Sequence, residues 1–435
     1  MAQQRTLGLA TATSLVVANM VGSGIYTSLG FQLQGLHSLF AVLMLWVVGG
    51  IMALCGSLVY AELGAAFPHN GGEYNFLSKL YSPLVGFLAG WVSAFVGFAA
   101  PVAAVSLALG HYLHRATGGQ LPALPLSMAV LVLLTVLHAW HTQAGARFQR
   151  LSTVVNVLLM LTLIGSSLAL QQPQPVPLAP NRTDWQEILG NPAFATNLYW
   201  VSYAYTGWNA AAYIAGEIRQ PQRLLPRALI IGTLLVMLLY VLLNYAFLRA
   251  APTHALRGQL EVGYIAGGYL FGPGGARWMG LLIAMALLST MSAMTFAGPR
   301  VMAQLGQQVP ALLVLGRQNR YGAPTLAVCL QSGIAAVLIA INQFQLVIDL
   351  IGFTLAISTS MAVAGVFILR QRPNLQPSFK IWGYPLVPLL YLAGNAWILY
   401  YGLLLKWQAS LGGLCIIAVG VLIWWLFGRR GTHGN

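Results

Sequence analysis

Charged residues are scarce in this chain of 435 residues: Asp, Glu, Lys and Arg make up only 6% of it. Soluble proteins carry roughly a quarter of their residues as these four types. Hydrophobic residues reach 58%, and the mean hydropathy is +0.74. A soluble fold of this length needs more polar surface than such a composition supplies. The lack of charge therefore excludes an ordinary soluble domain and indicates a protein of the lipid bilayer.

Acidic residues and cysteines are also few. Seven Asp and Glu stand against 21 Lys and Arg, so the net charge is +14. The basic residues lie singly or in small groups between apolar runs, which indicates loops that orient a membrane protein rather than a nucleic-acid partner. The three cysteines, Cys55, Cys329 and Cys415, lie inside apolar runs without disulfide or metal-ligand spacing. We therefore expect no metal and no cofactor.

Long runs without any charge are what the sequence does contain. A helix needs about 20 mostly apolar residues to cross a bilayer. Residues 6–61 are long enough for two such helices, with a turn expected near Gln32–Gly35. Each of the other runs is long enough for one helix: 80–114, 116–146, 151–181, 188–216, 228–248, 278–299, 321–348, 350–369, 381–405 and 407–428. The sequence thus predicts an all-α polytopic membrane protein with 12 transmembrane helices.

The basic residues are distributed unevenly between the two sides of these spans. If the N-terminus is cytoplasmic, 15 of the 21 Lys and Arg fall in cytoplasmic loops and 6 in external loops. Because positive loops favour the cytoplasmic side, we expect both termini there, in the cell inner (plasma) membrane. Arg5 precedes an apolar stretch without a credible cleavage site, so this stretch is interpreted as the first span and not as a signal peptide.

Three connecting segments have a distinct character. Residues 171–180 contain repeated Pro and Gln and predict an extended external linker. Residues 251–275 are too polar to span and too apolar for a free loop, so we expect a packed external lid. Residues 72–80 predict a short cytoplasmic helix.

Two spans contain polar, glycine-bearing interruptions. In the first span Gly22 and Gly24 flank Ser23, and each glycine weakens a helix by roughly 1 kcal/mol relative to alanine. Alone, this pattern also fits a small-residue packing face. Residues 203–209 (YAYTGWN) interrupt the sixth span, five spans later, as an inverted repeat of spans 1–5 and 6–10 requires. The pair favours a solute site between broken helices 1 and 6.

Several short segments, in order along nearly the whole chain, resemble the amino acid–polyamine–organocation superfamily. They are VGSGI (21–25), YAELG (60–64), GGEY (71–74), YTGWN (205–209), EIRQP (217–221), AGPR (297–300) and KIWGYP (380–385). The L-type amino-acid transporters and their bacterial relatives are the branch they resemble most. This resemblance implies a ten-helix core over residues 1–370 with a 5+5 inverted repeat, about 8–171 and 192–370. Residues 381–428 then form two additional transmembrane helices.

The resemblance also implies where a substrate binds. Its carboxylate meets the amides of Ser23 and Gly24, and its ammonium meets carbonyls at Met20, Tyr203 and Thr206. The full substrate-binding set is Met20, Ser23, Gly24, Ile25, Tyr203, Ala204 and Thr206. Tyr203 also matches an aromatic gating position, and Asn209 matches a polar or acidic one.

The placement of the acidic residues bears on the substrate. All seven (Glu62, Glu73, Asp184, Glu187, Glu217, Glu261 and Asp349) fall in loops or near span ends. A charge at mid-membrane is costly and normally marks function. Its absence favours a neutral amino acid over a cationic one, and the lack of a buried Lys or Arg argues against glutamate. Thr206 stands where the L-type branch often has glycine, which favours smaller substrates.

Coupling to an ion is a separate question. Asn156 falls where many bacterial relatives carry a lysine, so that charge is missing here. Asn156 either hydrogen-bonds the broken first helix or makes an ordinary interhelical contact. Ser289, Thr290 and Ser292 could ligate sodium, but mid-span hydroxyls more often bond their own helix. We therefore rank uncoupled exchange above sodium or proton symport.

The expected function is secondary transport of small neutral L-amino acids by alternating access, as a sodium-independent exchanger. The spans hold no nucleophile–base pair or metal cluster, which argues against an enzyme. The tails, residues 1–5 and 429–435, are short for a non-transporting sensor of the same fold. Animal L-type relatives join a partner through an external cysteine after span 3. Residues 113–123 contain none, so no disulfide-linked partner is expected.

Overall fold

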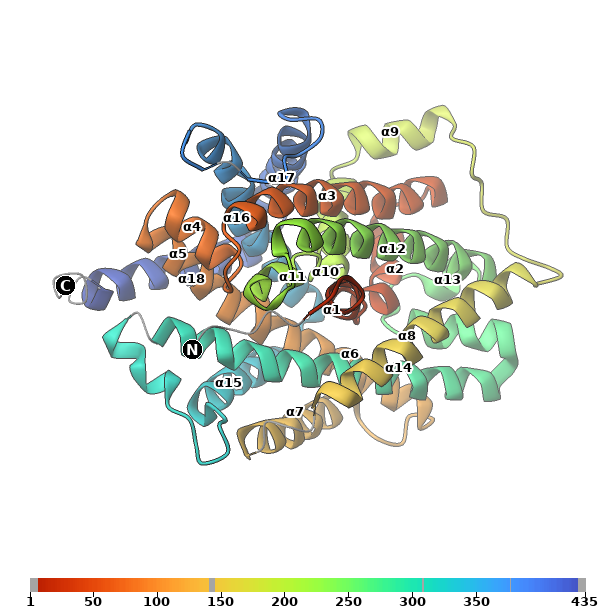
Figure 1. Ribbon diagram of the computed structural model, residues 1–435. Helices are drawn as coiled ribbons and strands as arrows, with labels where there is room; N and C mark the ends of the chain where they lie inside the picture. Colours follow the sequence, from red (N-terminus) through yellow and green to blue (C-terminus); the bar gives the residue numbers. More distant parts are fainter. Residues whose placement is uncertain (1–6, 141–144, 307–308, 376, 429–435) are drawn as a thin grey trace.

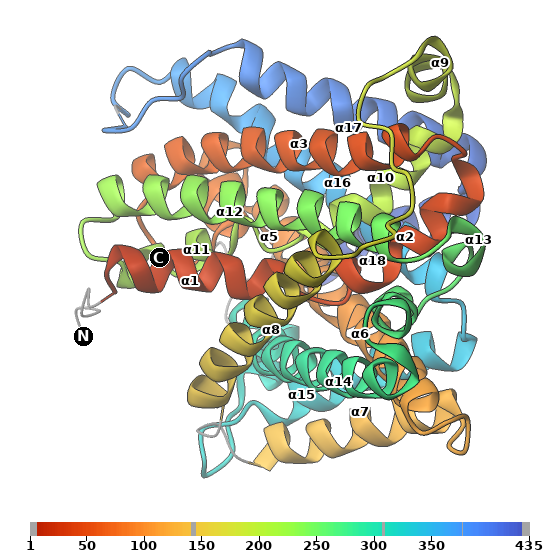
Figure 2. The same ribbon diagram turned by 90° about the vertical axis from the view of Figure 1, so that its right-hand side faces the viewer.

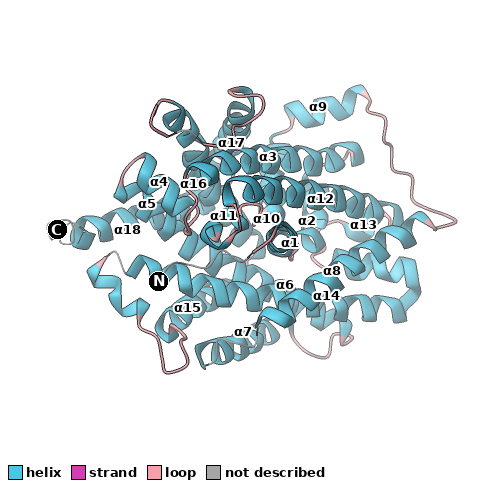
Figure 3. Ribbon diagram, viewed as in Figure 1, coloured by secondary structure: helices cyan, strands magenta, loops and turns pink. Residues whose placement is uncertain are grey.

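All regular elements of the protein are helices within the residues that the computed structural model describes, which are 7–140, 145–306, 309–375 and 377–428 (Figure 3). The one β-type pairing in these ranges is an isolated bridge between Leu7 and Ile218. Within the described residues, eight helices are long and apolar enough to cross a membrane, and a bent pair makes a ninth. The prediction of an all-α protein with many apolar helices is thereby confirmed.

Figure 1 labels the helices α1 to α8 in the described residues of the first part of the chain. The elements are α1 (Leu9–Met20), α2 (Gly24–Gly35), α3 (Leu39–Ala66), α4 (Glu73–Leu80), α5 (Pro83–Val92), the π-helical turn Ser93–Ala99, α6 (Ala100–Ala116), α7 (Ala123–Trp140) and α8 (Gly145–Leu168).

The remaining elements follow a linker at 169–181. They are α9 (Arg182–Gly190), α10 (Pro192–Tyr205), α11 (Ala210–Tyr213), the 3₁₀ turn Ala215–Glu217, α12 (Pro221–Ala250), α13 (Thr253–Leu256), α14 (Val262–Gly306), the 3₁₀ helix Pro310–Gly316, α15 (Thr325–Ile341), α16 (Phe344–Arg370), α17 (Leu386–Leu405) and α18 (Trp407–Phe427).

The turn between the first two predicted spans lies later than expected. The sequence predicted it near Gln32–Gly35, but α2 continues through Gly35 and α3 begins at Leu39. Gln32 is buried, and its Oε1 accepts a hydrogen bond from Trp46 Nε1 at 3.0 Å. This tertiary partner satisfies the side-chain oxygen of Gln32, which helps to keep the polar residue inside the helix. Ser38 then caps α3 by accepting from the Ala41 amide at 2.9 Å.

The structure describes all three of the unusual connections. Residues 171–180 contain no helix, and the Gln174 amide donates to the Arg249 carbonyl at 2.9 Å. The lid segment packs against the bundle, since Leu256 and Val262 are fully buried. Helix α14 bends within this segment at Gly272, whose φ is 74°. Helix α4 occupies the predicted short helix before the third span.

The helices differ in how much neighbouring protein covers them. Helices α1, α3 and α12 lie side by side, with α8 slanted against α1 and α12, and α9 and α13 lie at one end of the bundle (Figure 2). Only 17% of the apolar window of α7, and of that of α18, is buried, so these two are peripheral. In α2, nine of twelve residues are buried. A helix buried on all sides belongs to the core, so α2 lies at the centre.

Candidate functional site

The first predicted helix break is present. Helix α1 ends at Met20, Val21 is extended (φ −73°, ψ 95°), and α2 begins at Gly24 with its axis bent by 40° from that of α1. The predicted cause is the pair of glycines around Ser23, which provides little resistance to unwinding. The break leaves the last carbonyls of α1 and the first amides of α2 without partners inside their own helices.

The second predicted break is also present. Helix α10 ends at Tyr205, Thr206 is non-helical (φ −51°, ψ 137°), and α11 begins only at Ala210. Gly207 has a φ of 104°, and a Cβ on it would lie 2.7 Å from the carbonyl carbon and oxygen of Asn19. Glycine is required here for two reasons: the left-handed conformation and the close approach of α1. The two breaks are therefore in contact.

Short contacts join the two broken helices. The hydroxyls of Ser23 and Tyr203 share a hydrogen bond of 2.6 Å. A Cβ on Gly24 would lie only 2.5 Å from the Cα of Ala204, so the helices touch at backbone level. Such approaches occur where a small residue faces the neighbouring helix.

A tyrosine that the sequence did not single out bridges the two breaks. The hydroxyl of Tyr240, on α12, lies 2.6 Å from the Met20 carbonyl and 3.1 Å from the Ala204 carbonyl. It has one proton and can donate to only one carbonyl at a time. The available signal was a tyrosine in the middle of an apolar span, because a buried phenol needs a polar partner.

A cavity of about 1270 Å³ lies beside the breaks. Of the predicted site residues, Tyr203, Thr206, Asn209 and Ser292 line it. The cavity extends along α1, from Asn19 at the break to Leu7.

The other predicted substrate residues lie beneath its wall. Met20, Ser23, Ile25 and Ala204 are at most 3% exposed, and Gly24 is buried as well. The structure brings residues of both breaks together, since Ser23 bonds Tyr203 and Gly24 packs against Ala204.

Glu73 joins this site from outside the spans. Its Oε1 accepts a hydrogen bond from Asn209 Nδ2 at 2.9 Å, and its side chain lines the cavity. The sequence predicted Glu73 in a loop or near a span end, and the structure has it at the first residue of the short helix α4. Its approach to the predicted gating residue depends on contacts between distant segments, so local pattern did not reveal it.

The predicted coupling residues have different surroundings. Asn156 Oδ1 accepts from the Tyr26 hydroxyl at 2.5 Å, which links α8 to the second half of the broken first helix. Thr290 bonds the Ala286 carbonyl of its own helix at 3.2 Å, the ordinary arrangement for such a hydroxyl. Ser292 lies 2.9 Å from His138 Nε2, and Ser289 is buried in the same helix.

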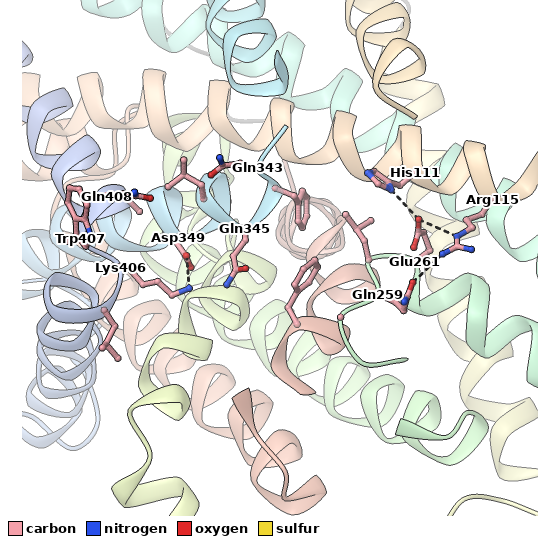
Figure 4. Close-up of a pocket in the computed structure, with 17 residues that line it drawn as sticks. His111, Arg115, Gln259, Glu261, Gln343, Gln345, Asp349, Lys406, Trp407 and Gln408 are labelled. Atoms are coloured by element: carbon pink, nitrogen blue, oxygen red, sulfur yellow. Dashed lines mark hydrogen bonds and ion pairs between the residues drawn. The ribbon is translucent and has the colours of Figure 1, made fainter. Parts of the chain in front are cut away.

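A second cavity, of about 620 Å³, shares no lining residue with the first. On one side of it Lys406 pairs with Asp349 at 3.0 Å, and on the other His111 and Arg115 face Glu261 (Figure 4). Burial opposes the charge of Glu261, but the hydrogen bond from His111 and the charges of His111 and Arg115 outweigh it and lower its pKa.

Aromatic rings close this second cavity toward the broken helices. Phe31 and Phe344 line it, and Phe31 stacks on Trp200 of α10 with ring centroids 4.5 Å apart. This cavity lies at the first turn of α16, whereas the larger one contacts residues 351–359 of that helix. The rings therefore lie at the opposite end of the site from Glu73.

The protein has apolar helices of spanning length, and two helix breaks meet beside a solute-sized cavity. These features define a helical membrane protein with an internal site for a small polar solute. The model of a family described as amino acid permease matches residues 7–427. The chain therefore belongs to the amino acid permease family of the amino acid–polyamine–organocation superfamily, and it is a multi-pass membrane protein. The resemblance drawn from the sequence motifs is confirmed.

Individual relatives are similar over nearly their full length. The human Asc-type amino acid transporter 1 is 27% identical over 460 residues, which cover 98% of this chain and 82% of that protein. The serine/threonine exchanger SteT of Bacillus subtilis (strain 168) is 27% identical over 402 residues, 91% of this chain and 90% of its own. The human large neutral amino acids transporter small subunit 2 is 26% identical over 450 residues, 98% and 81% respectively. These relatives support amino-acid transport.

Proposed function

We propose that this protein is a secondary transporter of small neutral L-amino acids that works by alternating access as a sodium-independent exchanger. The observation that carries the proposal is the meeting of the two helix breaks. Here the Tyr240 hydroxyl lies within hydrogen-bond distance of the Met20 and Ala204 carbonyls, next to the first turn of α2. Carbonyls and helix N-terminal amides are the partners that an ammonium and a carboxylate require.

Binding would exchange internal contacts for substrate contacts. The α-ammonium takes the place of the Tyr240 proton at the Met20 carbonyl, and the carboxylate takes the amides of Ser23 and Gly24. For this to happen the 2.6 Å bond between Ser23 and Tyr203 opens. Tyr203 and Thr206, on the cavity wall, then face the substrate side chain, with Ile25 and Ala204 behind them.

Glu73, Glu217 and Arg300 line the cavity, but none of them lies in the helix breaks themselves, which fits a neutral side chain. The Glu73 carboxylate already accepts three hydrogen bonds, from Tyr60, Asn209 and Ser358. No Lys or Arg lies among the described residues that form the breaks, 19–25 and 203–209. The relatives' names, serine/threonine exchanger and large neutral amino acids transporter, agree with this class.

We also propose 12 transmembrane helices, with a 5+5 repeat over 8–171 and 192–370 and two additional helices in 381–428. The protein then lies in the plasma membrane with both termini in the cytoplasm. Contacts between charged residues support this assignment of the cytoplasmic and external sides. Arg372 donates to the Lys79 carbonyl at 2.9 Å, and the predicted spans put the connections that hold both residues in the cytoplasm. Arg115 and Lys406 line one cavity, and the predicted spans put both of their connections outside.

A proton- or sodium-coupled symporter is the main alternative, and a non-transporting sensor is the other. The hydrogen bond of Thr290 to its own helix and that of Ser292 to His138 favour the uncoupled mechanism over a sodium site on α14. We also propose that no partner subunit is attached by a disulfide, because residues 113–123 contain no cysteine.

The test is uptake of labelled serine into proteoliposomes that contain the purified protein and unlabelled serine. Excess alanine, threonine or leucine is expected to compete in sodium-free buffer, whereas arginine and glutamate are not. Competition by arginine or glutamate as strong as that by alanine would overturn the neutral specificity. Uptake that appears only with a sodium or proton gradient would favour symport, and no uptake of any amino acid would favour the sensor.

A further inference from the structure

Glu73 is a buried carboxylate held by donors from three separate parts of the fold. It is 2% exposed at the start of α4. Its Oε1 accepts from the Tyr60 hydroxyl of α3 at 2.8 Å and from Asn209 Nδ2, just before α11, at 2.9 Å. Its Oε2 accepts from the Ser358 hydroxyl of α16 at 3.0 Å. The carboxylate therefore ties the second half of the broken α10–α11 helix to α3, α4 and α16.

No cation pairs with Glu73 in the described part of the chain. On the elements packed around it, Lys79 of α4 contacts His69, and Arg370 of α16 pairs with Glu62. Helices α5, α11 and α17 carry no charged residue.

The other titratable groups facing Glu73, besides its hydrogen-bond partner Tyr60, are the phenols Tyr213 of α11 and Tyr391 of α17. A buried carboxylate without a cation is costly unless it is fully hydrogen-bonded or takes up a proton. Burial raises the pKa of Glu73, against the opposing effect of its three hydrogen bonds.

A proton can reach this carboxylate through the site itself. Glu73 lines the large cavity together with Asn209, and the same cavity extends to Leu7 and Asn70. The group is thus buried within the fold yet placed on the wall of the proposed substrate path. Titration there would act directly on the residue predicted to gate that path.

We infer that Glu73 is a proton-binding site that holds or releases the α11 half of the broken helix. Asn209 Nδ2 can only donate, so Oε1 remains an acceptor and the proton goes to Oε2. Ser358 can accept from that proton by rotating its hydroxyl. The bonds from Tyr60 and Asn209 then end on a neutral carbonyl oxygen in place of a charged carboxylate. Hydrogen bonds to a charged group are roughly twice as strong as neutral ones.

The direction of the effect follows from the conformation in which the bonds are seen. Here the ionised carboxylate holds α11 while the cavity contacts the length of α1. Protonation of Glu73 weakens the hydrogen bonds that hold α11 in this conformation, and it does not weaken a conformation in which those bonds are absent. The population of this conformation should therefore fall, by about fivefold, as the pH drops through the titration of Glu73. The inference deepens the proposed transport function, but its measurement requires no substrate.

The experiment measures how fast N-ethylmaleimide labels one cysteine in the cavity, between pH 4.5 and 8. The three native cysteines are replaced by alanine, and Ala18→Cys on the cavity wall is the reporter. Gln172→Cys, exposed in the linker, is labelled in a parallel sample. The ratio of the two rates removes the common effect of pH on thiol ionisation. The same reporter is then measured with Glu73→Gln and, as a matched control, with Glu217→Gln.

Glu217 is a suitable control because it is a carboxyl on the same cavity, bonded to Asn70 at 3.4 Å and not to Asn209. The expected ratio falls about fivefold with acidification in the parent and in Glu217→Gln, and stays low at every pH in Glu73→Gln. Ser358→Ala removes a donor to the carboxylate and should move the midpoint to higher pH, which tests the inference even if Glu73→Gln does not fold.

The inference is overturned if the ratio does not change with pH in the parent, or if Glu73→Gln keeps the parent's response. It is also overturned if Ser358→Ala leaves the midpoint in place. Because no amino acid is added, these results are independent of whether uptake of serine is observed. A protein that labels as expected but transports nothing would contradict the proposed function alone.

Discussion

Replacement of Gly24 by alanine is the most direct perturbation of the contact between the two broken helices. The added Cβ would lie 2.5 Å from the Cα, 2.7 Å from the Cβ and 3.0 Å from the amide nitrogen of Ala204. These are atoms of a buried helix and not the end of a flexible side chain. Carbon atoms pack best about 3.5–4.0 Å apart, so α2 and α10 must separate by roughly 1 Å.

The magnitude follows from the cost of overpacking. Extra methyl groups in a well-packed interior cost about 1–3 kcal/mol. If only the conformation with α2 against α10 bears this cost, its population falls roughly 5- to 150-fold. Because the same separation disturbs the amides at the start of α2, we expect serine uptake to fall by at least about tenfold.

Gly22 provides the matched control, two residues away in the same break. A Cβ there would meet Thr290 Cγ2 at 3.4 Å and the Met20 carbonyl oxygen at 3.9 Å, which are ordinary contacts. Uptake by Gly22→Ala should therefore stay within about twofold of the parent. Both variants are compared at equal amounts of monodisperse protein. Full uptake by Gly24→Ala, or an equal loss in both variants, would refute the reasoning.

Three further substitutions test other contacts. Asn156→Ala leaves the buried Tyr26 hydroxyl without its acceptor, so thermal unfolding in micelles should show a stability lower by about 1–3 kcal/mol. Adding Tyr26→Phe should restore part of this stability, and equal stability of Asn156→Ala and the parent would contradict the prediction. Arg370→Ala leaves Glu62 buried without its cation and should cost about 3 kcal/mol in the same assay, with recovery on adding Glu62→Gln. Tyr240→Phe removes the hydroxyl that competes with the substrate ammonium for the Met20 carbonyl, so the KM for serine should fall. A higher KM in a stable protein would contradict this competition.

The sequence was informative where local chemistry decides the structure. Gly22 and Gly24 predicted the first break because few other residues yield so readily in a helix. Gly207 predicted the second, and its φ of 104° explains why a glycine is needed there. Charge-free runs predicted the helices because a spanning helix cannot expose charge to lipid.

The sequence was uninformative where distant segments meet. Gln32 seemed to mark a turn, yet Trp46 donates to its side-chain oxygen and the helix continues. Glu73 seemed to be a loop residue, and only the assembled bundle brings Asn209 and Ser358 to it. Tyr240 was a phenol in an apolar span, which signals a need for a polar partner but does not say which one. In each case the polar partner is fixed by tertiary packing, which leaves no local pattern.

The measurement that tests the central claim most directly is counterflow at equal pH on both sides and without sodium. Labelled serine is added to proteoliposomes that are either empty or preloaded with unlabelled serine, and protein with Gly24→Ala is measured in parallel. We expect labelled serine to accumulate rapidly only in preloaded vesicles with the parent protein. With Gly24→Ala this accumulation should be at least about tenfold lower. Equal accumulation in empty and preloaded vesicles would contradict exchange, and full counterflow by Gly24→Ala would contradict a site at the meeting of the two broken helices.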